Sequence, residues 1–266
     1  MRQFIKIIAA AALIAAIELP AADFYDLHSR DFWRPAGEKV IFDFDKITAS
    51  GQVMLRSREH IKIEENRTYN LKMIFSGNEF EETYVYVGFE PCDRKGASIP
   101  AYCWQSYNNT FTQVTRSAAR GAYSFFVKDA SNWTKNIYGC VVADAEKDFS
   151  DIPNSNLIAN AVVSIQKKGD EWMIGLREPL RHKLEAGTNA RQHAHGGYCY
   201  LGGARMKVPL DGELKIDKKI KGYAPFGHYS LQQWPKNSEY AYLIILIDWT
   251  GTETSTIITE ASMTVE

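Results

Sequence analysis

Short runs of alternating apolar and polar residues recur along this chain of 266 residues, and they constrain its fold more than any other feature. Residues 69–75 alternate in this way before a turn at 76–78, which places one face of a strand on a core and the other toward water. Residues 162–165 and 171–176 flank Lys167-Lys168-Gly169-Asp170 and indicate a β-hairpin. Past residue 22, no stretch keeps an apolar period of 3.6 over three helical turns. The pattern predicts an all-β protein.

Further strand-like segments continue to the end of the sequence. They are 40–44, 83–89, 123–127, 138–143, 213–216, 242–247, 256–258 and 261–265. Turns separate them roughly every 8 to 15 residues, a spacing typical of sandwiches and barrels. No linker rich in Pro, Gly or Ser divides the chain. We therefore predict one antiparallel β-sandwich domain over residues 23–266.

The first 22 residues have the pattern of a secretory signal peptide. Arg2 and Lys6 precede an uncharged apolar run at 7–17, and Ala21 and Ala22 provide a small-residue exit. The run is shorter than the roughly 20 apolar residues that a membrane span needs. The sequence thus predicts a secreted, periplasmic or extracellular protein that does not span a membrane. The alternative is a buried N-terminal helix.

Composition sets further limits. Hydrophobic residues make up 45% of the chain, enough for a sizeable core, and the formal net charge of −1 gives no basic surplus for nucleic acid. The four cysteines, Cys92, Cys103, Cys140 and Cys199, permit two disulfides in an oxidising compartment. Four reduced, buried thiols are the alternative.

Several segments, taken in order, resemble a known family. They are Tyr86-Val87-Gly88-Phe89, Asp93-Arg94-Lys95-Gly96, 129–133, Asp151-Ile152-Pro153-Asn154, 172–176, 186–193 and 196–200. This order resembles galactose-binding-like jelly-roll domains, the carbohydrate-binding modules of secreted bacterial polysaccharide-degrading proteins. The resemblance runs from about residue 40 to the end and rests on turns and core positions. It implies a jelly-roll fold and glycan binding. The chain departs from the usual arrangement because no catalytic domain accompanies the module, so a lectin or a surface-layer component stays open.

The segment 191–200 is the strongest candidate for a binding site. On a strand, Arg191, His193 and His195 would point to one face, and Tyr198 follows them. Arginine and histidine nitrogens suit sugar hydroxyls or a carboxylate. Two other interpretations stay open. One is a solvated strand end, and the other is a metal bound by His193 and His195, which would need further ligands.

Aromatic side chains provide a second recognition device, because their flat faces stack on sugar rings. Trp104 and Tyr107 lie together in a segment rich in amide side chains, in what the pattern predicts to be a loop. We therefore predict that they form a binding platform. By contrast, Trp133 and Trp234 are expected to pack over the ends of the sandwich, and Trp172 is expected in the core.

The leading hypothesis is a secreted, non-catalytic module that binds polysaccharide, with no catalytic residue assigned. A jelly-roll polysaccharide lyase is one alternative, in which Tyr198 or His193 moves the proton while Arg191 and Gln192 neutralise a uronate. A structural or adhesive envelope protein is the other. No cofactor is certain, although Asp43 and Asp45 could help to hold a structural calcium ion.

Overall fold

A computed structural model describes residues 22–34, 39–77, 82–202, 205–225, 232–249 and 254–266. All but the last residue of the predicted leader lies outside these ranges. Every pairing between the named strands is antiparallel. The predicted all-β fold with antiparallel sheets is confirmed, and the helical elements described are two short 3-10 turns, η1 (Arg30–Phe32) and η2 (Ala101–Cys103).

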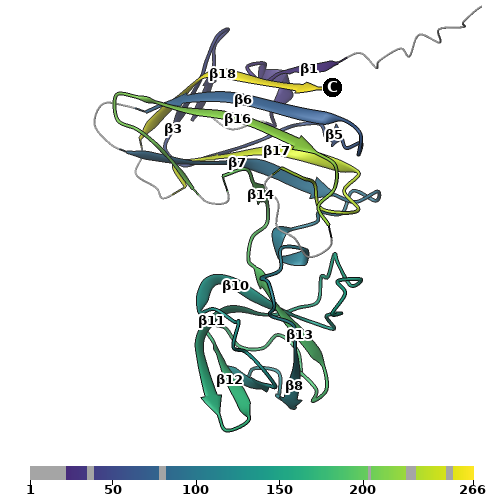
Figure 1. Ribbon diagram of the computed structural model, residues 1–266. Coiled ribbons are helices and arrows are strands. Elements are labelled where there is room, and N and C mark those ends of the chain that lie inside the picture. The colour runs from purple at the N-terminus through teal and green to yellow at the C-terminus, as the bar shows by residue number, and fades with distance from the viewer. Residues whose placement is uncertain (1–21, 35–38, 78–81, 203–204, 226–231, 250–253) are drawn as a thin grey trace, which may run out of the picture.

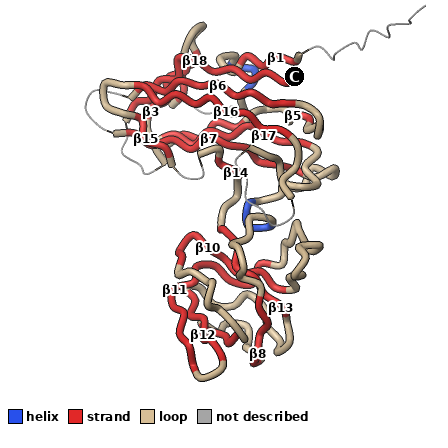
Figure 2. Tube along the Cα trace, viewed as in Figure 1, coloured by secondary structure: helices blue, strands red, loops and turns tan. Residues whose placement is uncertain are grey.

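Two sheets pack face to face to form a sandwich (Figures 1 and 2). The first sheet contains β16 (Glu213–Lys221), β6 (Thr68–Ser76), β18 (Ser255–Val265), β3 (Ile47–Ser50) and β2 (Val40–Phe42), with β1 (Asp23–Asp26) paired to β18. The second sheet contains β14 (Cys199–Tyr200), β7 (Thr83–Cys92), β17 (Tyr240–Ile247) and β4 (Val53–Arg56), with β15 (Met206–Val208) paired to β7 and β5 (Ile61–Lys62) paired to β17.

Alternation explains the sandwich core. In β7 and β17 the odd-numbered residues, such as Val87 and Leu243, are buried against the first sheet, while most even-numbered ones point away from it. Trp234 enters this core from a loop, and its ring contacts Tyr69 and Phe89 edge-on at centroid distances of 5.2 and 4.9 Å. The expected packing role of Trp234 is confirmed, because its side chain is buried.

A closed barrel is inserted between two neighbouring strands of the second sheet (Figure 1). Its strands are β10 (Asn136–Ala143), β11 (Leu157–Lys168), β12 (Glu171–Leu176), β9 (Ser124–Val127), β8 (Thr112–Arg116) and β13 (Asn189–Ala194). The chain leaves the sandwich after β7 and returns at β14, which pairs with β7. The prediction of one sandwich over residues 23–266 therefore omitted the barrel. Local alternation marks strands but does not say which strands pair.

The barrel has a core of its own. Phe125, Val127, Val141 and Ile174 are buried there together with Trp133, whose indole nitrogen donates to the carbonyl of Thr110 at 2.7 Å. Trp133 is a packing residue as expected, but it packs in the barrel core and not over an end of the sandwich. Trp172 packs against the same core while partly exposed. The predicted hairpin is β11 and β12, joined by a turn after Lys168.

A third, small cluster joins the two bodies. It contains Ile99, Cys103, Trp104, Ile152 and Ala224. All four cysteines are described, and all four are free thiols, so the structure has no disulfide. Burial raises the pKa of Cys103 to about 11, which keeps this thiol protonated and unreactive.

Candidate functional site

The structure does not bring the six sequence-predicted site residues onto one surface. Trp104, Arg191 and His193 are buried, Tyr107 and Tyr198 are half-buried, and His195 is exposed. The alternation that placed Arg191 and His193 on one face of a strand holds, but that face of β13 is turned into the protein.

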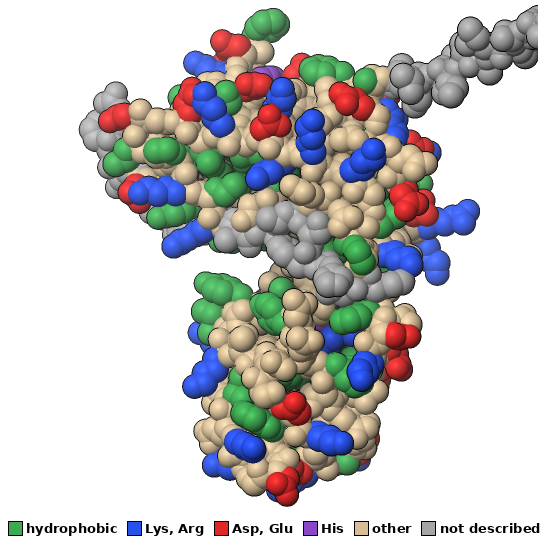
Figure 3. Space-filling view, viewed as in Figure 1, with side chains coloured by type: hydrophobic (Ala, Val, Ile, Leu, Met, Phe, Trp, Pro, Cys, Tyr) green, Lys and Arg blue, Asp and Glu red, His purple; other side chains and the backbone are tan. Residues whose placement is uncertain are grey.

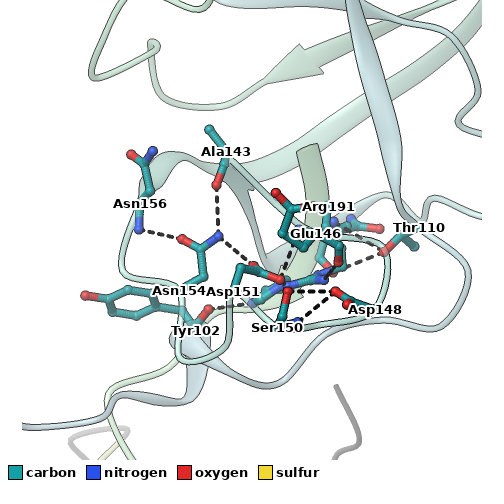
Figure 4. A network of polar contacts seen from close by, with 12 residues as sticks. Tyr102, Thr110, Ala143, Glu146, Asp148, Ser150, Asp151, Asn154, Asn156 and Arg191 are labelled. Carbon is teal, nitrogen blue, oxygen red and sulfur yellow. Dashed lines mark hydrogen bonds and ion pairs between the residues drawn. The ribbon is translucent and has the colours of Figure 1, made fainter. Parts of the chain in front are cut away.

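Arg191 is bonded within the protein, on the outer side of β13, through all three of its nitrogens (Figure 4). Its Nη2 atom donates to Asp151 Oδ2 at 2.8 Å, and its Nη1 atom donates to the carbonyl of Glu146 at 3.0 Å. Its Nε atom donates to His193 Nε2 at 2.8 Å. The guanidinium also lies 4.6 Å from the ring centroid of Phe149. Arg191 is only 1% exposed, and its bonds to Glu146 and Asp151 hold the loop 144–156 against β13.

His193 is held in one neutral form. Its Nε2 atom accepts from Arg191, so its proton lies on Nδ1 and is donated to the carbonyl of Tyr102 at 2.7 Å. Burial, together with the smaller effect of the neighbouring Arg191 charge, lowers the pKa of His193 to about 4. With both ring nitrogens engaged and no exposed surface, this histidine is structural.

Asp151 is equally well satisfied (Figure 4). Its Oδ2 atom also accepts from Asn154 Nδ2 at 2.8 Å, and its Oδ1 atom accepts from the backbone N–H of Glu146 at 3.0 Å. Asn154 in turn donates to the carbonyl of Ala143 at 2.9 Å. The network is therefore buried and bonded within the protein, and it ties together parts of the chain that are far apart in sequence.

Trp104 and Tyr107 do not form the predicted platform. Trp104 is only 3% exposed, because it fills the cluster that joins barrel and sandwich. The hydroxyl of Tyr107 accepts from Asn136 Nδ2 at 2.7 Å, and burial raises its pKa. Both residues lie in a segment that packs against β13. Their side chains are therefore not exposed, although they lie outside the strands.

The last two predicted residues lie where the chain returns to the sandwich. The backbone N–H of His195 donates to the carbonyl of Tyr138 at 2.6 Å. Tyr198 belongs to the sandwich, where its hydroxyl lies 3.9 Å from Met54 Sδ on β4. Tyr198 thus reaches across the outer face of the second sheet.

That outer face carries a concentration of tyrosines that the sequence reasoning missed. We call it the tyrosine face, and it is formed by Tyr84, Tyr86, Tyr198, Tyr200, Tyr240 and Tyr242. All six are half-buried. The available signal was three Tyr-x-Tyr pairs, at 84 and 86, 198 and 200, and 240 and 242. Because side chains alternate along a strand, each pair puts two rings on the same face.

Strand register shows that the rings form a connected surface. Across the sheet, Tyr86 lies beside Leu246, and Tyr200 lies beside Gly88. The Tyr86 and Tyr200 ring centroids are 4.9 Å apart, and those of Tyr198 and Tyr200 are 6.0 Å apart. These rings help to cover Leu246, which is only 3% exposed although it points outward. The face extends along the strands over eight residue steps, from Tyr84 to the position beside Tyr240, or about 27 Å.

Gly88 allows this arrangement. A Cβ atom at Gly88 would lie 2.2 Å from the carbonyl oxygen of Cys199. Only glycine therefore lets β14 approach β7 so closely and bring Tyr198 and Tyr200 onto the face.

Arginines lie over tyrosine rings near both ends of the face. The Arg56 guanidinium is 3.5 Å and that of Arg34 is 5.4 Å from the Tyr242 ring centroid. At the other end, the Arg205 guanidinium is 4.3 Å from the ring centroid of Tyr84. His60 stacks edge-on to Tyr240 at 4.3 Å. Such contacts hold cationic groups in fixed positions against flat rings.

The tyrosine face is turned toward the barrel. Figure 1 shows β7 and β17 between the first sheet and the barrel, with the start of β7 overhanging the barrel. On that side, Figure 3 shows the surface hollowed between the two bodies. Burial raises the pKa of Tyr200, so its hydroxyl stays protonated and can both donate and accept hydrogen bonds.

Neither of the two candidate metal sites has further ligands among the described residues. Among the described residues, no group of three or more His, Cys, Asp or Glu side chains comes together as a metal site, either around Asp43 and Asp45 or around His193 and His195. Within the same part of the chain, no helix is long and apolar enough to cross a membrane.

Comparison with known proteins identifies no family. No protein-family model matches the chain, and no curated protein matches it. A search of solved structures finds a chain from a structure described as "Structure of infectious bursal disease virus Gt strain", at 9% sequence identity and a TM-score of 0.19. The match covers 97% of this chain and 44% of the viral chain, so this chain spans less than half the length of the protein it matches. A TM-score this low supports no inference about function.

Proposed function

We propose that this is an exported, non-catalytic protein that binds polysaccharide on its tyrosine face. The observation that supports the proposal is the set of six half-buried tyrosines on one sheet face, spread over about 27 Å of strand. Flat aromatic rings supply large contact area at low cost in side-chain entropy, and tyrosine adds a hydroxyl that bonds to polar ligands.

The length of the face favours a polymer over a single small molecule. Enclosed pockets suit small ligands, whereas this surface is the outer face of a sheet that lies toward the barrel (Figure 1). The export and the likeness to carbohydrate-binding modules, both inferred from sequence, favour a glycan as that polymer. The proposal moves the site away from Trp104, Arg191 and His193 and keeps Tyr198.

The lyase alternative is less well supported. A general base must reach the proton that it removes, and His193 has no exposed surface and both ring nitrogens bonded within the protein. The contact described for the Tyr198 hydroxyl is with Met54 Sδ, which cannot act as a general base. The geometry of this part of the chain therefore favours binding over catalysis.

A glycan array with the mature protein, from residue 23 onward, tests the proposal. We expect binding to a defined group of polysaccharides, and a loss of roughly tenfold or more in affinity for Tyr86→Ala or Tyr198→Ala. The matched control is Tyr123→Ala, because Tyr123 is 61% exposed on the barrel and should not affect binding. Equal losses for all three variants, or binding unchanged in Tyr86→Ala and Tyr198→Ala, would contradict a site on the tyrosine face.

A further inference from the structure

Two cations near the tyrosine face are not balanced by a carboxylate. Arg56 pairs with Glu90 at 2.7 Å, and Lys207 pairs with Glu82. Arg34 and Arg205 form no ion pair within the described residues, yet each guanidinium lies over a tyrosine ring of the face. The face therefore presents a local positive surplus although the whole chain has a net charge of −1.

We propose that the tyrosine face selects anionic polysaccharides, whose carboxylate or sulfate groups bind to Arg34, Arg56 and Arg205. This inference rests on the proposed function and names the chemical class of its ligand. Arginine suits both groups, because its planar fork bonds to two oxygens at once.

Arg56 adds an independent observation. Its Nη1 atom is buried and has no hydrogen-bond partner in the described part of the chain, although its Nε atom donates to Glu90. A buried donor without a partner is unfavourable, so an anionic group that reaches this atom and accepts from it would bind with a gain. Arg34, over the same Tyr242 ring, provides a second positive group beside it.

The spacing of the cations fits a repeating polymer. Tyr242 lies beside Glu90 on β7, six residues from Tyr84, so the two arginine sites are about 20 Å apart along the sheet. Tyrosine rings occupy the space between them. A chain that carries charge at intervals along its length would contact both arginine sites and stack on the rings between.

The same features fit a nucleic acid less well. Single-stranded nucleic acid also stacks on aromatic rings, but it carries a phosphate at every nucleotide and is bound in strongly basic grooves. Two unbalanced arginines on a chain of net charge −1 provide few such contacts. We therefore expect sparse charge on the ligand, and we treat oligonucleotide binding as an outcome that would overturn the inference.

The experiment compares polymers that differ in charge alone. Affinities are measured for polygalacturonate against its fully methyl-esterified form, and for dextran sulfate against dextran, within a wider array of neutral and charged glycans. We expect at least one charged member to bind at least tenfold more tightly than its neutral partner, with affinity falling as salt is added. The pair that responds distinguishes carboxylate from sulfate recognition.

Variants then locate the charge contacts. Arg34 and Arg205 are both exposed, so the double variant Arg34→Gln/Arg205→Gln should fold normally and lose at least tenfold in affinity for the charged polymer. The matched control is Arg120→Gln, an exposed arginine on the barrel. Binding of neutral glycans, with no preference for charge, would overturn this inference and leave the proposed function standing. A blank across the array, or binding of a single-stranded oligonucleotide alone, would overturn both.

Discussion

The barrel and the sandwich both place an arginine against an aromatic ring, and they use it in opposite ways. Arg191 lies over Phe149 with all its nitrogens bonded inside the protein, and it is 1% exposed. Arg56 lies over Tyr242 with one nitrogen unpartnered among the described residues. The difference separates a cation whose nitrogens are all bonded within the fold from one that keeps an unused donor beside its ion pair with Glu90. Hydrogen-bond saturation, more than residue type, indicates where a ligand can bind.

Breaking the barrel network should give the largest effect. Arg191→Met removes one partner of a buried ion pair and leaves Asp151 buried without its cation, so we expect a loss of about 4 kcal/mol in the free energy of unfolding. Chemical denaturation followed by tryptophan fluorescence measures it. A variant as stable as the wild type would show that Arg191 does not hold the loop 144–156.

Trp104→Ala should also destabilise the protein, by about 3 kcal/mol or more, because it empties the cluster that joins the two bodies. This result would sharpen the comparison, since the sequence placed Trp104 in a binding platform. We expect glycan affinity, measured under conditions where the variant is folded, to stay within about twofold of wild type. A selective loss of binding with normal stability would restore the original interpretation of Trp104.

The sequence predicted strands well and the site poorly, for a physical reason. Alternation depends on local geometry, so it located most strands and placed Arg191 and His193 on the same face. Whether that face is exposed depends on Asp151, 40 residues away in sequence, and on the loop that carries it. Polar residues suggested a surface, but a buried partner makes the same residues interior. The Tyr-x-Tyr pairs were visible, yet their meeting on one sheet depends on strand pairing across the inserted barrel.

Acid should weaken the barrel through His193. In the unfolded chain this histidine titrates near 6.5, whereas in the folded protein burial and the Arg191 charge lower its pKa to about 4. Between these two values the unfolded state binds more protons, so stability is full above pH 6.5 and falls as the pH drops toward 4, by up to about 3 kcal/mol. Urea unfolding across this range measures the loss. His193→Gln, which cannot be protonated, should lack this component, and an unchanged pH profile in the variant would contradict it.

The smallest expected effect tests the other half of the comparison. Arg34→Gln should change the free energy of unfolding by less than about 0.5 kcal/mol, because Arg34 is exposed and forms no ion pair among the described residues. Its contact with the Tyr242 ring contributes little to folding at an exposed site. If Arg34 is kept for a ligand, the same substitution should weaken binding of the charged polymer severalfold while thermal unfolding stays unchanged. Destabilisation comparable to that of Arg191→Met would instead make Arg34 a structural cation, and the distinction between the two regions would fail.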